Sequence, residues 1–264
     1  MSQSIPPYAF DTAIVRSPAA SVVDGLRDGN GPNPDFEVVC HEHAQYVEAL
    51  KHAGVNVVRL PALDAFPDSV FVEDPALVFS QGAIELRPGA LSRQGEVAEI
   101  SSALREQFDV VLSLPAGYAD GGDMLLTPKG LMIGLSARTD EAGAKALQTC
   151  LSKFNIASQI VATPPGVLHF KSDCSLLDEE TVLSTQRLAS SGVFDGFKVV
   201  LVPDGEEAAA NALRVNDSVL TGKGYALTNE LLDKHGYNVV ALPTDEIAKV
   251  DAGLSCMSLR WKKA

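Results

Sequence analysis

Cys256 lies near the end of the chain, in the stretch Val250-Asp-Ala-Gly-Leu-Ser-Cys-Met-Ser-Leu259. It follows a turn that contains glycine and stands at the head of a short apolar strand predicted over 257–261. Backbone on both sides can fix a thiol at the mouth of a strand, and a thiolate is a strong nucleophile. Free cysteine is also among the most buried residue types, so a structural cysteine is the alternative. The other polar residues of the chain decide between these two interpretations.

Carboxylates and one imidazole occur in irregular loops that each follow a short strand ending in proline. These residues are Asp68, Glu73 and Asp74, then Asp120 and Asp123, then His169 and Asp173, then Glu206, Glu207 and Asn211, and last Asp251 beside Cys256. A thiolate attacks an electrophilic carbon, and a neighbouring histidine can carry protons to the leaving group and from water. Clustered carboxylates suit a planar cation, because a guanidinium offers its donors as a fork. The residue types therefore indicate nucleophilic substitution at a guanidinium carbon.

Each of these signals also has a plainer explanation. A lone histidine among apolar residues, as in Val167-Leu-His-Phe170, is more often a core residue, and Asp120-Gly-Gly-Asp123 fits an ordinary turn. Glu73-Asp74 before Pro75 fits a solvated strand entry. Their common place in a repeat favours a shared site.

The repeat is the strongest organisational signal in the chain. Five segments read as the end of a helix, a turn, an apolar strand and a proline, at 54–61, 108–115, 155–164, 196–203 and 236–243. Proline ends each strand because it cannot donate a hydrogen bond to a neighbour. After four of the loops, two short strands joined by a turn are predicted, within 75–86, 124–135, 175–184 and 212–221. The fifth copy is cut short at 256–261, and the opening strand 12–16 could pair with it and close a ring.

Helices complete the units. They are predicted at about 35–53, at 95–107, from the cap Thr139 to about Phe154, and at 228–235, with a short one within 186–195. The chain therefore reads as an α/β protein in which a ββαβ-type unit of ~50 residues is used five times around an axis. This predicts one domain over 1–264. A doubly wound sheet is the alternative, and the absence of a glycine-rich phosphate loop after a strand counts against it.

Composition narrows the classes of function. The 264 residues are 46% hydrophobic and 21% charged, which is ordinary for a globular protein. The formal net charge of −13 argues against nucleic acid, whose phosphates need a basic surface. No leader peptide and no membrane-spanning stretch is predicted. The four cysteines are far apart and form no CxxC pair, so we expect free thiols in a reducing cytoplasm and no zinc site.

Several motifs together resemble the dimethylarginine dimethylaminohydrolase family, which belongs to the guanidino-group-modifying, or pentein, superfamily. They are Phe71-Val-Glu-Asp74, Asp120-Gly-Gly-Asp123, Gly134-Leu-Ser-Ala-Arg-Thr139, Leu168-His169 with Lys171-Ser-Asp-Cys-Ser175, and Lys249-Val-Asp251 with Cys256. They run in order from about residue 66 to the C-terminus. The resemblance implies the pentein fold, a five-bladed α/β propeller with pseudo-fivefold symmetry, which agrees with the repeat.

The resemblance also implies residue roles. Cys256 is the expected nucleophile, His169 the general acid and base, and Asp120 the acidic residue next to them, although its side chain is shorter than the Glu of some members. The expected substrate-binding residues are Asp74 and Glu73 at the guanidinium, Asp68 at the amino-acid end, Arg87 and Arg138 at the α-carboxylate, Leu26 as a lid residue on the segment 25–33, and the carbonyl of Val250. That glycine-rich segment is predicted to be a mobile lid.

The implied reaction converts Nω,Nω-dimethyl-L-arginine, or the monomethyl form, into L-citrulline and dimethylamine or methylamine through a covalent thiouronium on Cys256. No cofactor and no metal are implied, and the partner is a small guanidino compound, with a homodimer as one option for the assembly. Three alternatives stay open. They are a relative that acts on arginine or another guanidino compound, a non-catalytic propeller-like binding protein, and a Cys-His-Asp amidase.

Overall fold

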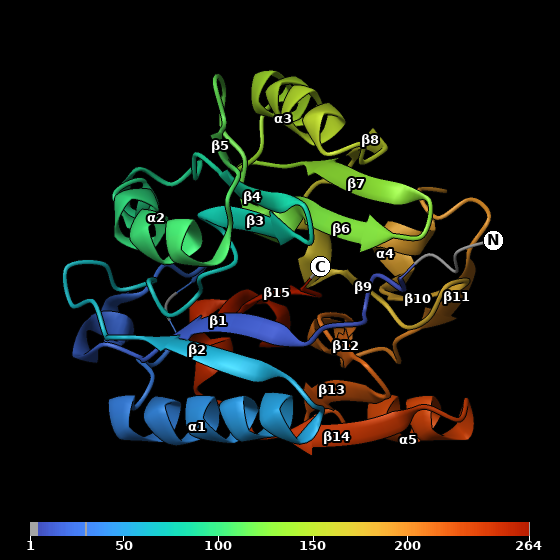
Figure 1. The fold of residues 1–264 in the computed structure, drawn as a ribbon. Coiled ribbons are helices and arrows are strands. Elements are labelled where there is room, and N and C mark those ends of the chain that lie inside the picture. The colour runs from blue at the N-terminus through green and yellow to red at the C-terminus, as the bar shows by residue number, and fades with distance from the viewer. Residues whose placement is uncertain (1–4, 30, 264) are drawn as a thin grey trace.

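Five three-stranded sheets make up the molecule in a computed structural model that describes residues 5–29 and 31–263 (Figure 1). In every sheet the middle strand pairs antiparallel with one neighbour and parallel with the other. The sheets are β15-β1-β2 (Leu259–Trp261, Thr12–Arg16, Asn56–Leu60), β3-β4-β5 (Ala76–Phe79, Gly82–Glu85, Val111–Ser113), β6-β7-β8 (Met124–Thr127, Gly130–Leu135, Ser158–Ala162), β9-β10-β11 (Cys174–Leu176, Thr181–Ser184, Lys198–Leu201) and β12-β13-β14 (Leu213–Val215, Ser218–Gly222, Asn238–Leu242). The five predicted strand–proline segments and the four predicted hairpins are confirmed.

A helix precedes the parallel strand in each sheet. The helices are α1 (Phe36–His52), α2 (Glu96–Gln107), α3 (Glu141–Lys153), α4 (Gln186–Ala189) and α5 (Ala226–Lys234). In Figure 1, α1 lies along β2 and reaches β14, and it contacts both strands. The predicted ββαβ unit is therefore confirmed, and so is the short helix within 186–195.

The two ends of the chain share one sheet. β1 pairs antiparallel with β15, with Thr12 opposite Trp261 and Ile14 opposite Leu259. The predicted closure of the ring by the opening strand is confirmed. Cys256 lies three residues before β15. The pairing of β15 with β1 therefore fixes the backbone near Cys256 within the ring of blades.

The burial of the strands follows from this arrangement. Every residue of the middle strands β1, β4 and β10 is buried, because other elements cover both of their faces. The parallel strands at the edges are partly exposed, and a proline follows most of them. Glycine ends two helices in the left-handed region, with φ of 86° at Gly54 and 84° at Gly236.

Two local predictions were wrong. The last strand begins at Leu259 and not at Met257, so Cys256 lies in the short 3-10 helix η7 (Leu254–Met257). The N-cap of α3 is Asp140, whose carboxylate accepts a hydrogen bond from the N–H of Gly143, and not Thr139. Thr139 instead takes part in the candidate site.

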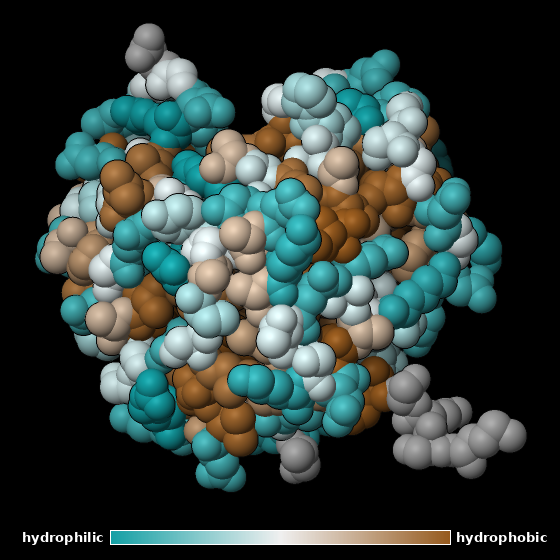
Figure 2. Space-filling model, turned by 90° about the horizontal axis from the view of Figure 1, so that it is seen from above, coloured by the Kyte–Doolittle hydropathy of each residue, from teal (hydrophilic) through white to brown (hydrophobic). Residues whose placement is uncertain are grey.

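The face in Figure 2 carries hydrophobic residues in several separate patches among hydrophilic ones. No helix in residues 5–29 or 31–263 is both long enough and apolar enough to cross a bilayer.

His43 gives the fold an acid-sensitive position. Its side chain is fully buried in α1, and burial, assisted by the nearby Arg59 cation, lowers its pKa from 6.5 to about 4. The unfolded chain therefore binds a proton between pH 6.5 and 4 that the folded chain does not, so folding stability should fall as the pH is lowered through this window. The full loss from this one group is about 3 kcal/mol. Urea unfolding at several pH values should show a shallower acid loss in His43→Leu than in the parent, and parallel curves would contradict this prediction.

Candidate active site

His169 and Asp120 meet at the end of the molecule where the loops gather. His169 directly precedes the 3-10 turn η4 (Phe170–Ser172), and Asp120 directly precedes η3 (Gly121–Asp123). The imidazole Nε2 lies 3.1 Å from Oδ2 of Asp120. The other carboxylate oxygen of Asp120 accepts a hydrogen bond of 2.7 Å from the N–H of Gly89. Asp120 is fully buried, so its short side chain is fixed in the position that orients the imidazole.

Asp123 holds the same histidine through the backbone. Its carboxylate accepts hydrogen bonds from the N–H of Phe170 at 2.8 Å and from the hydroxyls of Ser136 and Thr139 at 2.7 and 2.6 Å. Thr139 Oγ1 also accepts a bond of 3.1 Å from the N–H of Asp120. The turn 120–123 thus holds His169 in two ways. Asp120 bonds to its side chain, and Asp123 bonds to the N–H of the next residue, Phe170.

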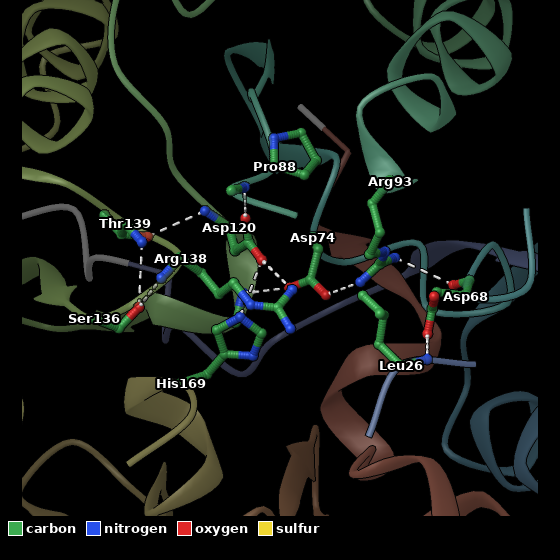
Figure 3. Close-up of polar contacts among 12 residues, drawn as sticks. Leu26, Asp68, Asp74, Pro88, Arg93, Asp120, Ser136, Arg138, Thr139 and His169 are labelled. Carbon is green, nitrogen blue, oxygen red and sulfur yellow. Dashed lines mark hydrogen bonds and ion pairs between the residues drawn. The ribbon is translucent and has the colours of Figure 1, made fainter. Parts of the chain in front are cut away.

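Asp74 completes an acidic group around the imidazole. One of its oxygens accepts a hydrogen bond of 2.9 Å from the N–H of Gly122, and the other is paired with the guanidinium of Arg93. Side-chain ligand atoms of Asp74, Asp120 and His169 all lie within 4.8 Å of one another. Figure 3 shows these side chains converging from separate elements, with Arg138 beside them.

Gly122 leaves room for this arrangement. A Cβ at this position would lie 2.7 Å from Nδ1 of His169, which is closer than real contacts allow, and at a tight 3.0 Å from Oδ1 of Asp74. We expect Gly122→Ala to displace the imidazole and to lower kcat/KM by about 100-fold, because small misplacements of reacting groups are costly. Gly224→Ala is a matched control, since its added methyl would meet Asp245 at an ordinary 3.5 Å. Equal activity of the two variants would contradict this role of Gly122.

Cys256 is held in place mainly through its backbone and its neighbour Ser255. The Cys256 N–H donates to the carbonyl of Gly253 at 3.3 Å, and its carbonyl accepts from the N–H of Glu73 at 3.2 Å. The N–H of Ser255 donates to Oδ1 of Asn211 at 3.1 Å, and its hydroxyl donates to Glu73 at 3.0 Å. These contacts join the Cys256 turn to loops from two other sheets.

One small cavity of about 40 Å³ brings the thiol and the imidazole together. Its lining includes these candidate residues: Cys256, His169, Asp74, Asp68, Arg138, Leu26 and Val250. Arg93 and Leu168 line it as well. A thiol, an imidazole and carboxylates around a cavity of this size are suited to covalent chemistry on a small cation.

Comparison with known proteins decides the family. No family model matches the sequence. The chain is 36% identical to the N(G),N(G)-dimethylarginine dimethylaminohydrolase of Pseudomonas aeruginosa, over 96% of this chain and all of that protein. It is 31% identical to the protein of the same name from Streptomyces coelicolor, over 95% of this chain and 97% of that protein. A solved structure of the Pseudomonas protein, a cysteine-to-serine variant complexed with citrulline, matches with a TM-score of 0.93 over 96% of this chain and all of that one.

The chain belongs to the dimethylarginine dimethylaminohydrolase family. The α/β propeller of the pentein superfamily is therefore its fold, with one blade for each of the five sheets.

Two residues expected at the substrate in this family lie elsewhere in the structure. The carboxylate of Glu73 is paired with Nζ of Lys171 at 2.5 Å and with the guanidinium of Arg260 at 2.9 Å, so it holds the Cys256 turn from behind. Arg87 is exposed, and its guanidinium lies 5.3 Å from the ring centre of Tyr118. Neither side chain lines the cavity, because other partners on neighbouring loops hold both of them.

Arg138 and Asp68 are two of the expected substrate-binding residues that line the cavity. Arg138 lines the cavity, with Nη1 3.9 Å from Oδ2 of Asp120. The Asp68 carboxylate accepts a hydrogen bond of 2.9 Å from the N–H of Leu26, which fixes one end of the segment 25–33. The N–H of Asp28 donates to the carboxylate of Asp251 and fixes the segment a second time. The predicted mobility of this lid stays a prediction.

Arg93 is a residue of this dimethylarginine dimethylaminohydrolase site that the sequence analysis missed. It is buried and pairs with Asp74 and with Glu96, the latter at 2.7 Å. Its Nη2 also donates to the carbonyls of Asp68 and Phe71 at 3.1 and 2.8 Å. Arg93 therefore fixes the carboxylate of Asp74 directly and the position of Asp68 through its backbone carbonyl (Figure 3). The one signal in the sequence is the spacing Arg93-x-x-Glu96, which is common on exposed helices.

The charges of the site shift the pKa values of the two reacting groups. Burial opposes a charged imidazole, but Asp74, the hydrogen bond to Asp120 and the charge of Asp123 together raise the pKa of His169 to about 9. Burial and the carboxylates of Glu73 and Asp74 raise the pKa of the Cys256 thiol to about 12. Burial alone would raise the pKa of Asp74, yet Arg93 and His169 hold it below its usual value. At neutral pH the free site therefore holds an imidazolium, a thiol and an ionised Asp74.

Asp74, Asp120 and His169 are also spaced closely enough to hold a metal ion. Their oxygens are already engaged with Arg93, with His169 and with backbone N–H groups, so the Arg93 guanidinium supplies a cation at this position. The absence of a metal requirement stays a prediction.

Proposed function

We propose that this protein hydrolyses Nω,Nω-dimethyl-L-arginine, and its monomethyl form, to L-citrulline and dimethylamine or methylamine. The observation that carries the proposal is the meeting of Cys256, His169 and Asp74 at one cavity. Membership in a hydrolase family whose Pseudomonas member was solved with citrulline supports it. The substrate class is a small guanidino compound.

In the proposed complex, Asp74 faces the guanidinium and Arg138 faces the α-carboxylate. The Asp74 carboxylate is held by Arg93 and Gly122, so it is set to accept donors from a planar cation without reorganising. Asp68 also lines the cavity, next to the Leu26 backbone, and is proposed to receive the α-amino group. The carbonyl of Val250 is proposed as a further acceptor.

The free enzyme needs the substrate to activate its nucleophile. A thiol with a pKa of about 12 is protonated at neutral pH, and a bound guanidinium adds a positive charge beside it. That charge lowers the thiol pKa, and the proton leaves to solvent. The thiolate then attacks the guanidinium carbon, a C–S bond forms, and the bond to dimethylamine breaks as His169 protonates the departing nitrogen.

The second half of the reaction uses the same histidine as a base. The first half leaves His169 neutral and a cationic thiouronium on Cys256. Neutral His169 takes one proton from water, the oxygen adds to the carbon, and the C–S bond breaks. The second water proton returns to the thiolate or to solvent, and neutral citrulline leaves. No step needs an oxidant or a cofactor.

The pKa values also predict the pH profile. The reactive form of the free enzyme combines a protonated His169 with a thiolate, and their pKa values are about 9 and about 12. The fraction in this form rises tenfold per pH unit below the lower value and then levels off. We therefore expect kcat/KM for dimethylarginine to rise from pH 6 toward about pH 9, and a profile that falls over this range would contradict the assignment.

An assay over three substrates tests the proposed function. Dimethylarginine, monomethylarginine and arginine are each incubated with the full chain, and citrulline, dimethylamine, methylamine and ammonia are measured. The proposal expects citrulline together with the methylated amine. Faster release of ammonia from arginine would move the assignment to a deiminase, and no turnover of any of the three would favour a binding protein.

We also propose a location in the cytoplasm, which the four free cysteines support. A homodimer is the proposed assembly, and sedimentation of the purified chain tests it.

A further inference from the structure

A second cavity lies behind the turn that carries Cys256. The first strand of every blade contributes to its wall, namely β3, β6, β9, β12 and β15, so we name it the axial cavity. Its volume is about 130 Å³. Glu73 and Ser255 line it, and these residues also contact the backbone of Cys256 or precede it in the chain.

The wall of the axial cavity is largely apolar. Side chains of this kind are Phe10, Phe79, Leu126, Leu176 and Leu213. A cavity of about 150 Å³ with Leu, Ile and Phe walls holds a benzene ring in another protein. The axial cavity therefore has room for a ligand body of about that size.

The charged residues of the axial cavity are three cations and one carboxylate. Lys171 and Arg260 both pair with Glu73, at 2.5 and 2.9 Å, and the third cation is Arg214. Arg214 donates to the carbonyls of Asn216 and Leu177, and within residues 5–29 and 31–263 it forms no ion pair with a carboxylate. The single carboxylate leaves the lining with an excess of positive charge, which favours an anionic ligand.

Two buried donors in this lining also lack partners. Within residues 5–29 and 31–263, Oγ of Ser175 and Nε of Arg260 make no hydrogen bond, and both atoms are shielded from solvent. Buried donors in folded proteins are nearly always satisfied by the protein, by ordered water or by a bound group. A carboxylate can accept from a hydroxyl and from a guanidinium N–H at once.

We infer that the axial cavity binds a small monocarboxylate with an aromatic or short aliphatic body. The body occupies the apolar wall, and the carboxylate takes up the free donors of Ser175 and Arg260. The site is separate from the cavity of Cys256 and His169, because the two cavities share no lining residue among those that the structure describes.

Occupancy should also slow catalysis, a consequence that rests on the proposed function. A second carboxylate beside Glu73 adds negative charge behind Cys256 and disfavours its thiolate. It also competes with Glu73 for Lys171 and Arg260, which hold the Cys256 turn. The ligand does not block the substrate cavity, so kcat should fall several-fold while KM stays nearly constant.

Calorimetric titration of the full chain with sodium benzoate tests the binding. We expect one saturable site with a dissociation constant of roughly 0.1–10 mM, in the range that ligand efficiency gives for nine heavy atoms. Benzamide has nearly the same shape without the charge and should bind at least about tenfold more weakly, since it cannot offer two anionic acceptors. Equal binding of the two compounds, or water alone in the cavity with no saturable binding of either, would overturn the proposal.

Two variants locate the site. Leu176→Trp fills the cavity and should abolish benzoate binding, whereas Leu227→Trp, at an exposed position on α5, should leave it unchanged. Should Leu176→Trp fail to fold, Ser175→Ala removes one free donor and should weaken binding several-fold with the core intact. Benzoate that citrulline displaces would instead occupy the substrate cavity next to Arg138, and this result would overturn the assignment.

The binding readout does not depend on turnover. Saturable benzoate binding in a protein without dimethylarginine activity would keep the axial site and reject the proposed function. Normal dimethylarginine activity with no benzoate binding would keep the proposed function and reject the axial site.

Discussion

Cys256→Ala is expected to lower turnover of dimethylarginine by at least about 10⁴-fold, because no other group near the substrate can form the covalent intermediate. The turn around the residue should persist, since Gly253 and Glu73 hold it by backbone hydrogen bonds. The carboxylates of Asp74 and Asp68 and the guanidinium of Arg138 are untouched by this change. Citrulline should therefore still bind, and equilibrium dialysis measures its dissociation constant.

Cys40→Ala is the matched control. Cys40 is a free, partly buried cysteine on α1 and lines neither the substrate cavity nor the axial cavity. It should retain parental kcat and KM. A Cys256→Ala protein with kcat within tenfold of the parent would rule out the covalent route, and loss of activity in both variants would point to unfolding.

His169→Gln is expected to lower kcat by about 10² to 10⁴-fold, because both halves of the reaction lose their proton carrier. Departure of the amine needs an acid, and attack of water needs a base. Gln keeps a donor near Asp120 but cannot exchange a proton. The levelling of kcat/KM at about pH 9 should also disappear, so that kcat/KM keeps rising with the thiolate fraction, since the raised His169 pKa causes that break.

Asp120→Asn separates orientation from proton transfer. Asn retains the shape but loses the charge that raises the pKa of His169, so the fall in rate should be smaller than in His169→Gln and the break in the pH profile should move to lower pH. The matched control is His52→Gln at the exposed end of α1. A His169→Gln enzyme that keeps the parental pH profile would contradict the role of the imidazole.

The architecture was predictable because it repeats. A strand ending in proline is a weak signal by itself, but five copies in order fix the strands, and β1 then had to fill the middle of the incomplete blade with β15. The limits of the predictions are local. Whether a helix is capped by Thr139 or Asp140 depends on one residue, and tertiary hydrogen bonds to Asp120 and Asp123 decide it.

The candidate site was predictable where loops of the repeat meet. His169, Asp74 and Cys256 come from three blades, and placing those loops at one end was enough to expect the three side chains around one cavity. The direction of a side chain was not predictable in the same way. Glu73 and Asp74 are adjacent, yet Lys171 and Arg260 hold one of them away from the cavity, while Arg93 holds the other at its edge.

Arg93 shows a further limit of sequence reasoning. Its role depends on burial together with two carboxylates and two backbone carbonyls, and an arginine near a glutamate gives no sign of burial in the sequence. A buried cation of this kind needs its carboxylate partners, because an unpaired charge in such a place would be strongly unfavourable, and only the fold brings those partners together.

Mass spectrometry of a trapped intermediate tests the central claim most directly. His169→Gly removes both the acid for a departing amine and the base for water, so this variant is incubated with S-methyl-L-thiocitrulline, whose methanethiolate can leave without an acid. The thiouronium should then form on Cys256 and accumulate, because the attack of water is slowed. After acid quench and digestion, the account predicts the added amidine mass on the peptide that contains Cys256, with Cys40, Cys150 and Cys174 unmodified. Citrulline formation without any adduct in this variant, or an adduct on one of the other three cysteines, would contradict it.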